Sequence, residues 1–232
     1  MKILVLGDIH GRTIWKQIVE KENPEKVIFL GDYVSTHEDI DAIQQIDNLE
    51  EILRFKKSNF DKVIILRGNH DTQHLGYEWA ECSGYNFEVA QYMQQEIKEE
   101  FLENTQWVYR EGNIIFSHAG VSKIWMENNN LKHVDQINEL PPSEVFGFTP
   151  CHFSDYCGTS ETQPPTWIRP QSLIFSGIDN YIQVVGHTPV NDICNTRDEL
   201  KYSDKEIWLC DCLPKEYLII EDNEFIKKEI SI

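Results

Sequence analysis

The sequence predicts an α/β fold, and three observations lead to this. Short segments rich in Val, Ile and Leu alternate with longer segments whose apolar residues recur at helical spacing, which is typical of parallel sheets. Five of the short segments run directly into a turn that carries Asp, Asn or His. The chain has 232 residues, of which 41% are hydrophobic, and this is enough for a sizeable core.

The first half of the chain supplies the alternating elements. Asn23-Pro24 ends the first helical pattern, because proline disfavours a helical conformation in the residue before it. We predict, in order, a strand at 2–6, a helix at 13–22, a strand at 27–30, a helix at 40–57, a strand at 63–66 and a helix at 87–102.

The second half begins with a hairpin. Glu111-Gly112-Asn113 is a turn signal between two short apolar segments, so a second sheet of mixed direction is expected to start there. The later strands are expected to end in a closing meander. We predict strands at 107–109 and 113–116, partly helical structure at 121–140, and strands at 181–185, 207–210, 217–220 and 224–230.

One segment is too irregular for a single element. Residues 141–170 contain six of the nine prolines and several aromatic residues. Long irregular segments of this kind are usually functional loops or lids. We therefore expect residues 1–232 to form a single domain, with a substrate-facing cap at about 141–170.

Charge and cysteine content exclude several classes of function. The formal charge of −18 opposes binding of an extended nucleic acid. No apolar stretch is long enough for a membrane span, and a strand from residue 2 leaves no room for a signal peptide, so a cytoplasmic location is expected. The six cysteines lack the Cys-x-x-Cys spacing of a structural zinc site and are expected to be mostly reduced.

The polar residues that follow the five strands are expected to form one metal centre. They are a mixed oxygen and nitrogen set, which suits manganese, iron, zinc or nickel better than calcium. Because six ligands are too many for one ion with an open position, we expect two divalent ions about 3.5–4 Å apart, with Asp32 as the bridge. Manganese is favoured. The candidate ligands are Asp8, His10, Asp32, Asn69, His118 and His187.

Such a centre favours hydrolysis of a phosphate ester. Two ions lower the pKa of a bridging water, so that the bridging hydroxide attacks phosphorus while both ions hold phosphoryl oxygens. His70 follows Asn69 directly, and in the extended backbone expected here the two side chains point in different directions. We therefore expect His70 to protonate the leaving group as a general acid.

The motifs at the strand ends occur in a definite order: Gly7-Asp8-Ile9-His10-Gly11, Gly31-Asp32-Tyr33-Val34, Leu66-Arg67-Gly68-Asn69-His70-Asp71, Ser117-His118-Ala119-Gly120 and Gly186-His187-Thr188. This order resembles the calcineurin-like metallophosphoesterases, particularly their serine/threonine protein phosphatase branch. The resemblance implies a four-layer αββα sandwich of two mixed β-sheets flanked by helices. It also implies that the first ion is held by Asp8, His10 and Asp32, and the second by Asp32, Asn69, His118 and His187.

The resemblance also concerns residues around the phosphate. Trp167-Ile168-Arg169 is similar to a family segment before the Gly-His-Thr block, which implies that Arg169 binds phosphate. In the protein phosphatase branch, Gly-Asp-Tyr-Val continues as Asp-Arg-Gly, where the Asp orients the acid histidine and the Arg holds phosphate. This chain has Ser35, Thr36 and His37 instead, so both helpers are missing at their expected positions.

Two further carboxylates, Asp71 and Asp211, are candidates for hydrogen bonds that orient the histidines of the site. Because Ser35 replaces the family Asp, we expect His70 to be oriented by Asp71, by Asp39 or by a loop carbonyl. Asp211 lies where the family ends its last active-site strand and is a candidate hydrogen-bonding partner of a metal-binding histidine.

The leading hypothesis is a dimetal-dependent phosphomonoesterase that acts on a phosphoprotein or a small phosphorylated compound. Because the Asp-Arg pair is absent, a dinucleoside polyphosphate hydrolase or a phosphodiesterase remains an alternative. A non-catalytic protein-binding scaffold with the same fold is an alternative from another class. The sequence does not predict the oligomeric state.

Overall fold

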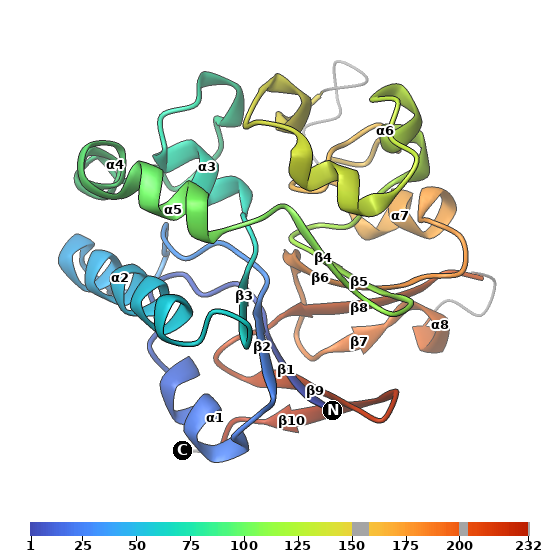
Figure 1. Ribbon diagram of the computed structural model, residues 1–232, viewed down its shortest axis with the longest axis horizontal. Coiled ribbons are helices and arrows are strands. Elements are labelled where there is room, and N and C mark those ends of the chain that lie inside the picture. Colours follow the sequence, from blue (N-terminus) through green and yellow to red (C-terminus); the bar gives the residue numbers. More distant parts are fainter. Residues whose placement is uncertain (150–157, 200–203, 232) are drawn as a thin grey trace.

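Two five-stranded sheets pack face to face, with helices on both outer sides (Figure 1). The computed structural model describes residues 1–149, 158–199 and 204–231. The arrangement is the four-layer α/β sandwich that the sequence predicted. No helix among the described residues is long and apolar enough to span a membrane, and the cytoplasmic location stays a prediction.

The first sheet has the strand order β10-β9-β1-β2-β3. Its three parallel strands are those predicted from the first half of the chain, and β9 pairs antiparallel with β1. The bounds are β1 (Lys2–Leu6), β2 (Lys26–Phe29), β3 (Val63–Ile65), β9 (Glu216–Glu221) and β10 (Glu224–Glu229).

The second sheet has the order β4-β5-β6-β8-β7. The predicted hairpin is present as β4 and β5, which pair antiparallel, and β5, β6 and β8 run parallel. The bounds are β4 (Val108–Glu111), β5 (Ile114–Ser117), β6 (Ile182–Pro189), β7 (Cys194–Asn195) and β8 (Glu206–Asp211).

The predicted closing meander is wrong. β8 lies in the second sheet, whereas β9 and β10 lie in the first. Since β6 and β7 already pair with the two edges of β8, no hydrogen-bonding edge is left for β9. The chain therefore crosses between the sheets after β8, and β9 pairs with β1 and β10.

Helices cover the outer face of each sheet (Figure 1). On the first sheet lie α1 (Trp15–Glu22), α2 (Ala42–Ser58), α4 (Phe87–Tyr92) and α5 (Lys98–Asn104), with a π-helical turn at Met93–Ile97 between the last two. The side chain of Asp41 caps α2 by accepting from the backbone N–H of Gln44. On the side of the second sheet are α6 (Lys123–Asn128), α7 (Pro170–Ser176), α8 (Thr196–Glu199) and short 3₁₀ turns at Val134–Glu139 and Glu144–Phe146. A further 3₁₀ turn at Glu78–Ala80 contacts both the Glu144–Phe146 turn and the helix at Asn69–His74.

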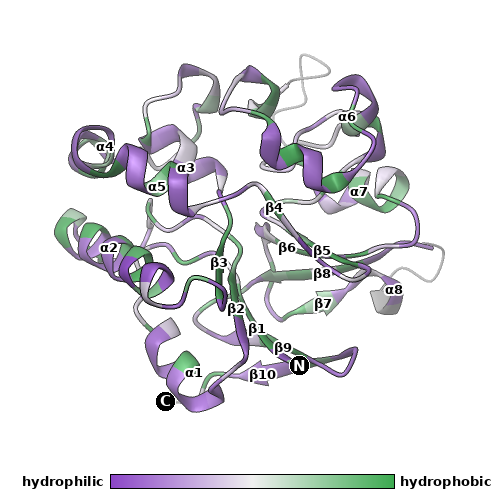
Figure 2. Ribbon diagram, viewed as in Figure 1, coloured by the Kyte–Doolittle hydropathy of each residue, from purple (hydrophilic) through white to green (hydrophobic). Residues whose placement is uncertain are grey.

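The hydrophobic core is layered, because successive strand residues point to opposite faces. In β1, Leu4 packs towards the helices, while Ile3 and Val5 pack between the sheets. Figure 2 shows the corresponding hydropathy, with hydrophobic residues along the central strands and both kinds of residue along α2. This core holds the carboxyl ends of β1, β2, β5 and β6 in fixed positions.

The extended backbone predicted around His70 is wrong. Asn69 and His70 form the first turn of α3 (Asn69–His74). The helix starts here because the Asp71 carboxylate accepts the backbone N–H of Gly68 at 2.8 Å. Successive side chains still point in different directions, since residues on a helix are about 100° apart around the axis.

The predicted cap is described in part. Residues 141–149 are irregular apart from the 3₁₀ turn at Glu144–Phe146, and Pro170 lies in the first turn of α7. Residues 150–157 of the cap, with Cys151 and Cys157, lie outside the described residues. The single-domain division stays a prediction.

Candidate active site

The structure brings the predicted site residues together at one edge of the sandwich. Asp8 and His10 follow β1, Asp32 follows β2, His118 follows β5, and His187 lies near the end of β6. Most of the predicted residues line one cavity of about 500 Å³, while His118 and Asp71 are buried around it. The cavity-lining members of the predicted set are Asp8, His10, Asp32, Asn69, His70, Arg169, His187 and Asp211.

The backbone is strained at three of these residues. His10, Asp32 and His187 have φ angles of 46°, 49° and 60°, in the left-handed region that residues other than glycine rarely adopt. Such conformations cost about 1–3 kcal/mol each and cluster at functional sites. Their presence at three predicted ligands supports a functional role for this edge of the sheet.

Close approach of the backbone explains two glycines. A Cβ atom at Gly68 would collide with Oδ1 of Asp32, and one at Gly186 would collide with Oδ1 of Asp8. Glycine therefore precedes both Asn69 and His187 because only a bare Cα lets the carboxylates lie this close.

Two groups of donor atoms share Asp32. One consists of Asp8, His10 and Asp32, and the other of Asp32, His118 and His187; within each group the donor atoms lie within 4.8 Å of one another. Nε2 of His118 is 3.4 Å from Oδ2 of Asp32. This shared carboxylate is the arrangement expected for two cations with Asp32 between them.

Asn69 joins the second group through its side-chain oxygen. Its Oδ1 lies 2.9 Å from Nε2 of His118 and 3.0 Å from Nδ1 of His187. Nε2 of His187 is buried, and among the described residues it has no hydrogen-bonding partner. The three donor atoms that converge, Oδ1 of Asn69, Nε2 of His118 and Nδ1 of His187, fit a site that receives a cation.

Backbone carbonyls orient two of the histidine rings. Nδ1 of His10 lies 3.1 Å from the Val34 oxygen, and Nδ1 of His118 lies 2.9 Å from the Leu30 oxygen. Contacts of this kind favour the Nδ1–H tautomer, in which the lone pair of Nε2 can bind a cation. For both histidines, Nε2 is the ring nitrogen that lies near a site carboxylate.

The buried charges also favour cation binding. Burial and repulsion by Asp211 raise the pKa of Asp8 well above its usual range. Burial opposes charging of His118, but Asp32 and Asp8 raise its pKa to about 10. Divalent cations would stabilise the carboxylates in their ionised form.

His70 is held against Asp32. Its backbone N–H donates to Oδ1 of Asp32 at 3.0 Å, and its Nε2 lies 3.9 Å from Oδ2. Burial lowers the pKa of His70, although the charge of Asp32 opposes this. Its other ring nitrogen, Nδ1, lies 3.6 Å from the sulfur of Cys82.

Arg169 lines the same cavity. Its Nη1 donates to the His187 carbonyl oxygen at 2.8 Å and to Oγ1 of Thr188 at 3.1 Å. The indole of Trp167 packs edge-on against the ring of His187, with 5.7 Å between the ring centroids. The guanidinium is therefore anchored next to a candidate ligand.

Asp71 stabilises the backbone turns that carry the site residues. Its carboxylate accepts the backbone N–H groups of Asp32, Tyr33 and Gly68 at 2.9, 2.8 and 2.8 Å. Both oxygens are thus engaged with the backbone and not with the ring of His70. Asp211 lines the cavity, but among the described residues its carboxylate makes no hydrogen bond to a histidine.

Sequence reasoning missed several residues of the cavity wall. Ser35, His37 and Pro189 lie within five residues of a candidate ligand, residues 81–83 lie in the loop after α3, and Phe148 belongs to the predicted cap. The additional lining residues are Ser35, His37, Glu81, Cys82, Ser83, Phe148 and Pro189.

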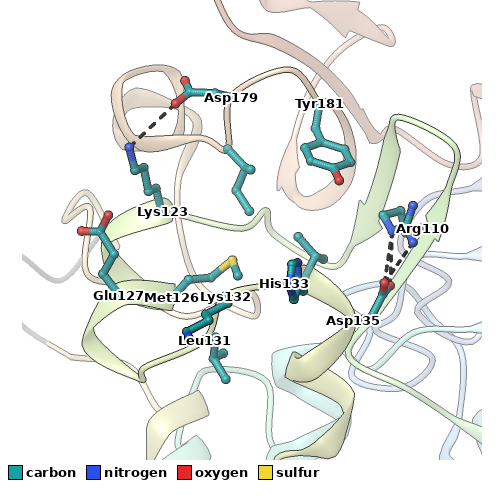
Figure 3. Close-up of a pocket in the computed structure, with 12 residues that line it drawn as sticks. Arg110, Lys123, Met126, Glu127, Leu131, Lys132, His133, Asp135, Asp179 and Tyr181 are labelled. Carbon is teal, nitrogen blue, oxygen red and sulfur yellow. Dashed lines mark hydrogen bonds and ion pairs between the residues drawn. The ribbon is translucent and has the colours of Figure 1, made fainter.

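A second hollow, of about 400 Å³, lies beside α6 and has different chemistry (Figure 3). Arg110 pairs with Asp135 at 3.0 Å, and Lys123 pairs with Asp179 at 3.8 Å. These charges are therefore partly neutralised by one another. Among the described residues, both groups of donor atoms that could hold a metal ion lie at the first cavity and not in this hollow.

Comparisons with known proteins agree with the geometry. Solved structures similar to this chain include a cold-active protein-tyrosine phosphatase of the psychrophile Shewanella sp., at 17% identity and a TM-score of 0.68, covering 98% of this chain and 77% of that one. A Saccharomyces cerevisiae protein serine/threonine phosphatase matches at 15% identity and a TM-score of 0.62, covering 100% and 80%. No curated protein sequence matches the chain.

A metallophosphoesterase from Sphaerobacter thermophilus is also similar, at 15% identity and a TM-score of 0.55, covering 100% of this chain and 88% of the other. At these identities the structural likeness shows the fold alone. A sequence model of the calcineurin-like phosphoesterases matches residues 1–205, which is most of the chain. The chain therefore belongs to the calcineurin-like phosphoesterase family.

Proposed function

We propose that this phosphoesterase hydrolyses phosphate monoesters and uses two divalent cations, with manganese favoured. The observation that carries the proposal is the shared position of Asp32. It belongs to both donor groups and also holds His70, whose Nε2 lies 3.9 Å from its Oδ2. The candidate cation ligands and the candidate general acid are therefore connected through the carboxylate of Asp32.

The ligands divide between the two cations as the donor groups do. Asp8, His10 and Asp32 would hold one cation, and the second would be held by Asp32, Asn69, His118 and His187. When bound, the two ions supply hydroxide at neutral pH and neutralise charge on the phosphoryl oxygens.

The remaining residues act on the substrate. Arg169, anchored beside His187, would bind a phosphoryl oxygen. An oxygen derived from water forms the new bond to phosphorus, and the bond to the ester oxygen breaks with its electron pair on that oxygen. His70 donates its Nε2 proton to the leaving oxygen, which gives an alcohol and inorganic phosphate.

The cavity wall favours an aromatic ester. Phe148 and Trp167 both line the cavity and pack edge-to-face, with 5.3 Å between ring centroids. Such an apolar wall suits the ring of an aryl phosphate, including phosphotyrosine, better than the short chain of phosphoserine. The similar structures include phosphatases named for each of these specificities.

The test is hydrolysis of p-nitrophenyl phosphate by metal-free protein that is reloaded with Mn²⁺, Fe²⁺, Zn²⁺ or Ni²⁺. We expect turnover with Mn²⁺, and an Asp32→Asn variant that loses affinity for both ions together. A matched control is Asp135→Asn, which removes an exposed carboxylate at the second hollow. Absence of turnover with every one of these metals contradicts the proposal.

Two alternatives are separated by the same preparation. A dinucleoside polyphosphate hydrolase or phosphodiesterase, credible because Ser35 and Thr36 replace the Asp-Arg pair of related phosphatases, would prefer a dinucleoside tetraphosphate or bis(p-nitrophenyl) phosphate to the monoester. A protein-binding scaffold would purify without transition metal and would keep its partner after Asn69→Ala.

A further inference from the structure

The loop after α3 places a thiol against the ring of His70. Sγ of Cys82 lies 3.6 Å from Nδ1 of His70 and 4.0 Å from the carbonyl oxygen of Asn69. Cys82 is half-buried and lines the active-site cavity. Among the described residues, no other side chain hydrogen bonds to this ring nitrogen.

Contacts from outside the loop fix the position of the thiol. Oγ of Ser35 donates to the carbonyl oxygen of Gly84 at 2.7 Å. The side-chain oxygen of Gln73 accepts the backbone N–H of Cys82. Gly84 has a φ of 73°, and a Cβ there would collide with Oγ of Ser35, so only glycine lets the loop close this tightly.

The same contact determines which ring nitrogen faces the reaction. Because Nδ1 is directed at Cys82, Nε2 is the nitrogen directed at Asp32, 3.9 Å from its Oδ2. The thiol donates to the Asn69 carbonyl oxygen, so its sulfur accepts from Nδ1–H of His70. Because the proton given to the leaving group comes from Nε2, Nδ1–H can donate to the sulfur both before and after that transfer.

We propose that Cys82 is a positioning residue for His70, held in place by Ser35 and Gln73, and that it aims Nε2 at the leaving oxygen. The proposal rests on the phosphoesterase function proposed above. It assigns a role to Ser35, which lies outside the ligand set but fixes the loop that carries the thiol.

The test compares two aryl phosphates whose leaving groups differ in their need for a proton. Phenyl phosphate releases a basic phenolate, whereas 2,4-dinitrophenyl phosphate releases a stable anion that needs little acid catalysis. General acids typically contribute 10²–10⁴-fold. If Cys82 only positions the acid, we expect Cys82→Ala to lower kcat on phenyl phosphate by about 10-fold and on the dinitrophenyl ester by less than about twofold.

Three further variants and one spectroscopic readout sharpen the test. Cys82→Ser should recover part of the loss, Ser35→Ala should change the ratio of the two rates in the same direction, and Cys194→Ala, a half-buried thiol on β7, should leave it unchanged. In the Zn²⁺-loaded protein, the ¹⁵N shifts of His70 should show one neutral tautomer in the wild type and a mixture in Cys82→Ala.

The outcomes are distinct. An equal loss on both esters, or an unchanged ratio in both Cys82→Ala and Ser35→Ala, overturns the positioning role while the phosphoesterase function stands. Wild-type protein that hydrolyses neither ester overturns the proposed function and this inference with it. If Cys82→Ala does not fold, the same ratio is measured in Cys82→Ser and Ser35→Ala, and no change in either variant overturns the proposal.

Discussion

Asp71→Asn tests whether the buried carboxylate below the site organises its backbone. Asp71 is fully buried, and its two oxygens accept three backbone N–H groups, two of them at Oδ2. In the asparagine variant, the best amide orientation keeps the oxygen at the Oδ2 position and turns the NH₂ group towards the N–H of Tyr33. One charge-assisted hydrogen bond is then lost and one donor faces another.

The expected loss of stability follows from those contacts. Hydrogen bonds to charged groups contribute about 1.5–3 kcal/mol each, so Asp71→Asn should cost about 2–3 kcal/mol and Asp71→Ala about 4–6 kcal/mol. Domains are typically stable by only about 5–15 kcal/mol, so the alanine variant should be close to unfolding.

The assay is urea unfolding of metal-free protein, because bound metal would add its own stabilisation to the native state. It is run at a pH well above 7, because burial and the charge of Asp32 raise the pKa of Asp71 to about 7. The control is Asp135→Asn, whose exposed ion pair with Arg110 should change the free energy of unfolding by less than about 0.5 kcal/mol. An Asp71→Asn variant within about 0.5 kcal/mol of the wild type would refute the reasoning.

Three other predictions concern different parts of the chain. Arg67→Lys should cost about 2 kcal/mol of stability and leave the metal affinity unchanged. The buried guanidinium of Arg67 donates to both Oγ1 and the carbonyl oxygen of Thr105, and a lysine ammonium cannot make this pair of bonds. Urea unfolding measures the stability, and metal titration measures the affinity. Removing the cations with a chelator should lower the melting temperature, and ions at 100 times their Kd should restore about 2.7 kcal/mol of stability for each site that they fill. Burial opposes ionisation of Glu22, but Lys2 and Tyr217 lower its pKa below 4.5, so its stabilisation is present above pH 4.5 and is lost as the pH falls through the lowered value. The Glu22→Gln difference should therefore be at most about 1 kcal/mol at pH 7 and vanish in acid unfolding curves.

The first sheet and the positions of the candidate ligands were the most predictable features. Parallel strands bring their carboxyl ends to one edge, so residues that follow β1 and β2 meet there without any knowledge of side-chain packing. The order of the five motifs then added the sandwich architecture. The first sheet was predictable because it depends on local sequence patterns and on the rules of sheet topology, whereas the sandwich was implied by the family resemblance.

Features set by tertiary contacts were not predictable in the same way. The polar segment Asn69–His74 has no apolar periodicity that would predict a helix. The helix begins where the carboxylate of Asp71 also accepts the backbone N–H of Asp32, in the turn after β2. The strands β8 and β9 are both short, continuous apolar runs, and such a run does not indicate which sheet it joins. The loop around Cys82 is held beside His70 by contacts that include those of Ser35 and Gln73, and no local pattern encodes them.

The strained ligands are stabilised by one another. Asp8 accepts the backbone N–H of His187 at 3.0 Å, and the carbonyl oxygen of Asp32 accepts the N–H of His10 at 2.7 Å. Each left-handed residue costs about 1–3 kcal/mol, and hydrogen bonds from other strand ends offset that cost. The Asp8 carboxylate, a candidate ligand in the first donor group, therefore also aligns His187 of the second group. Replacement of Asp8 should disturb both halves of the centre, although Asp8 belongs to only one donor group.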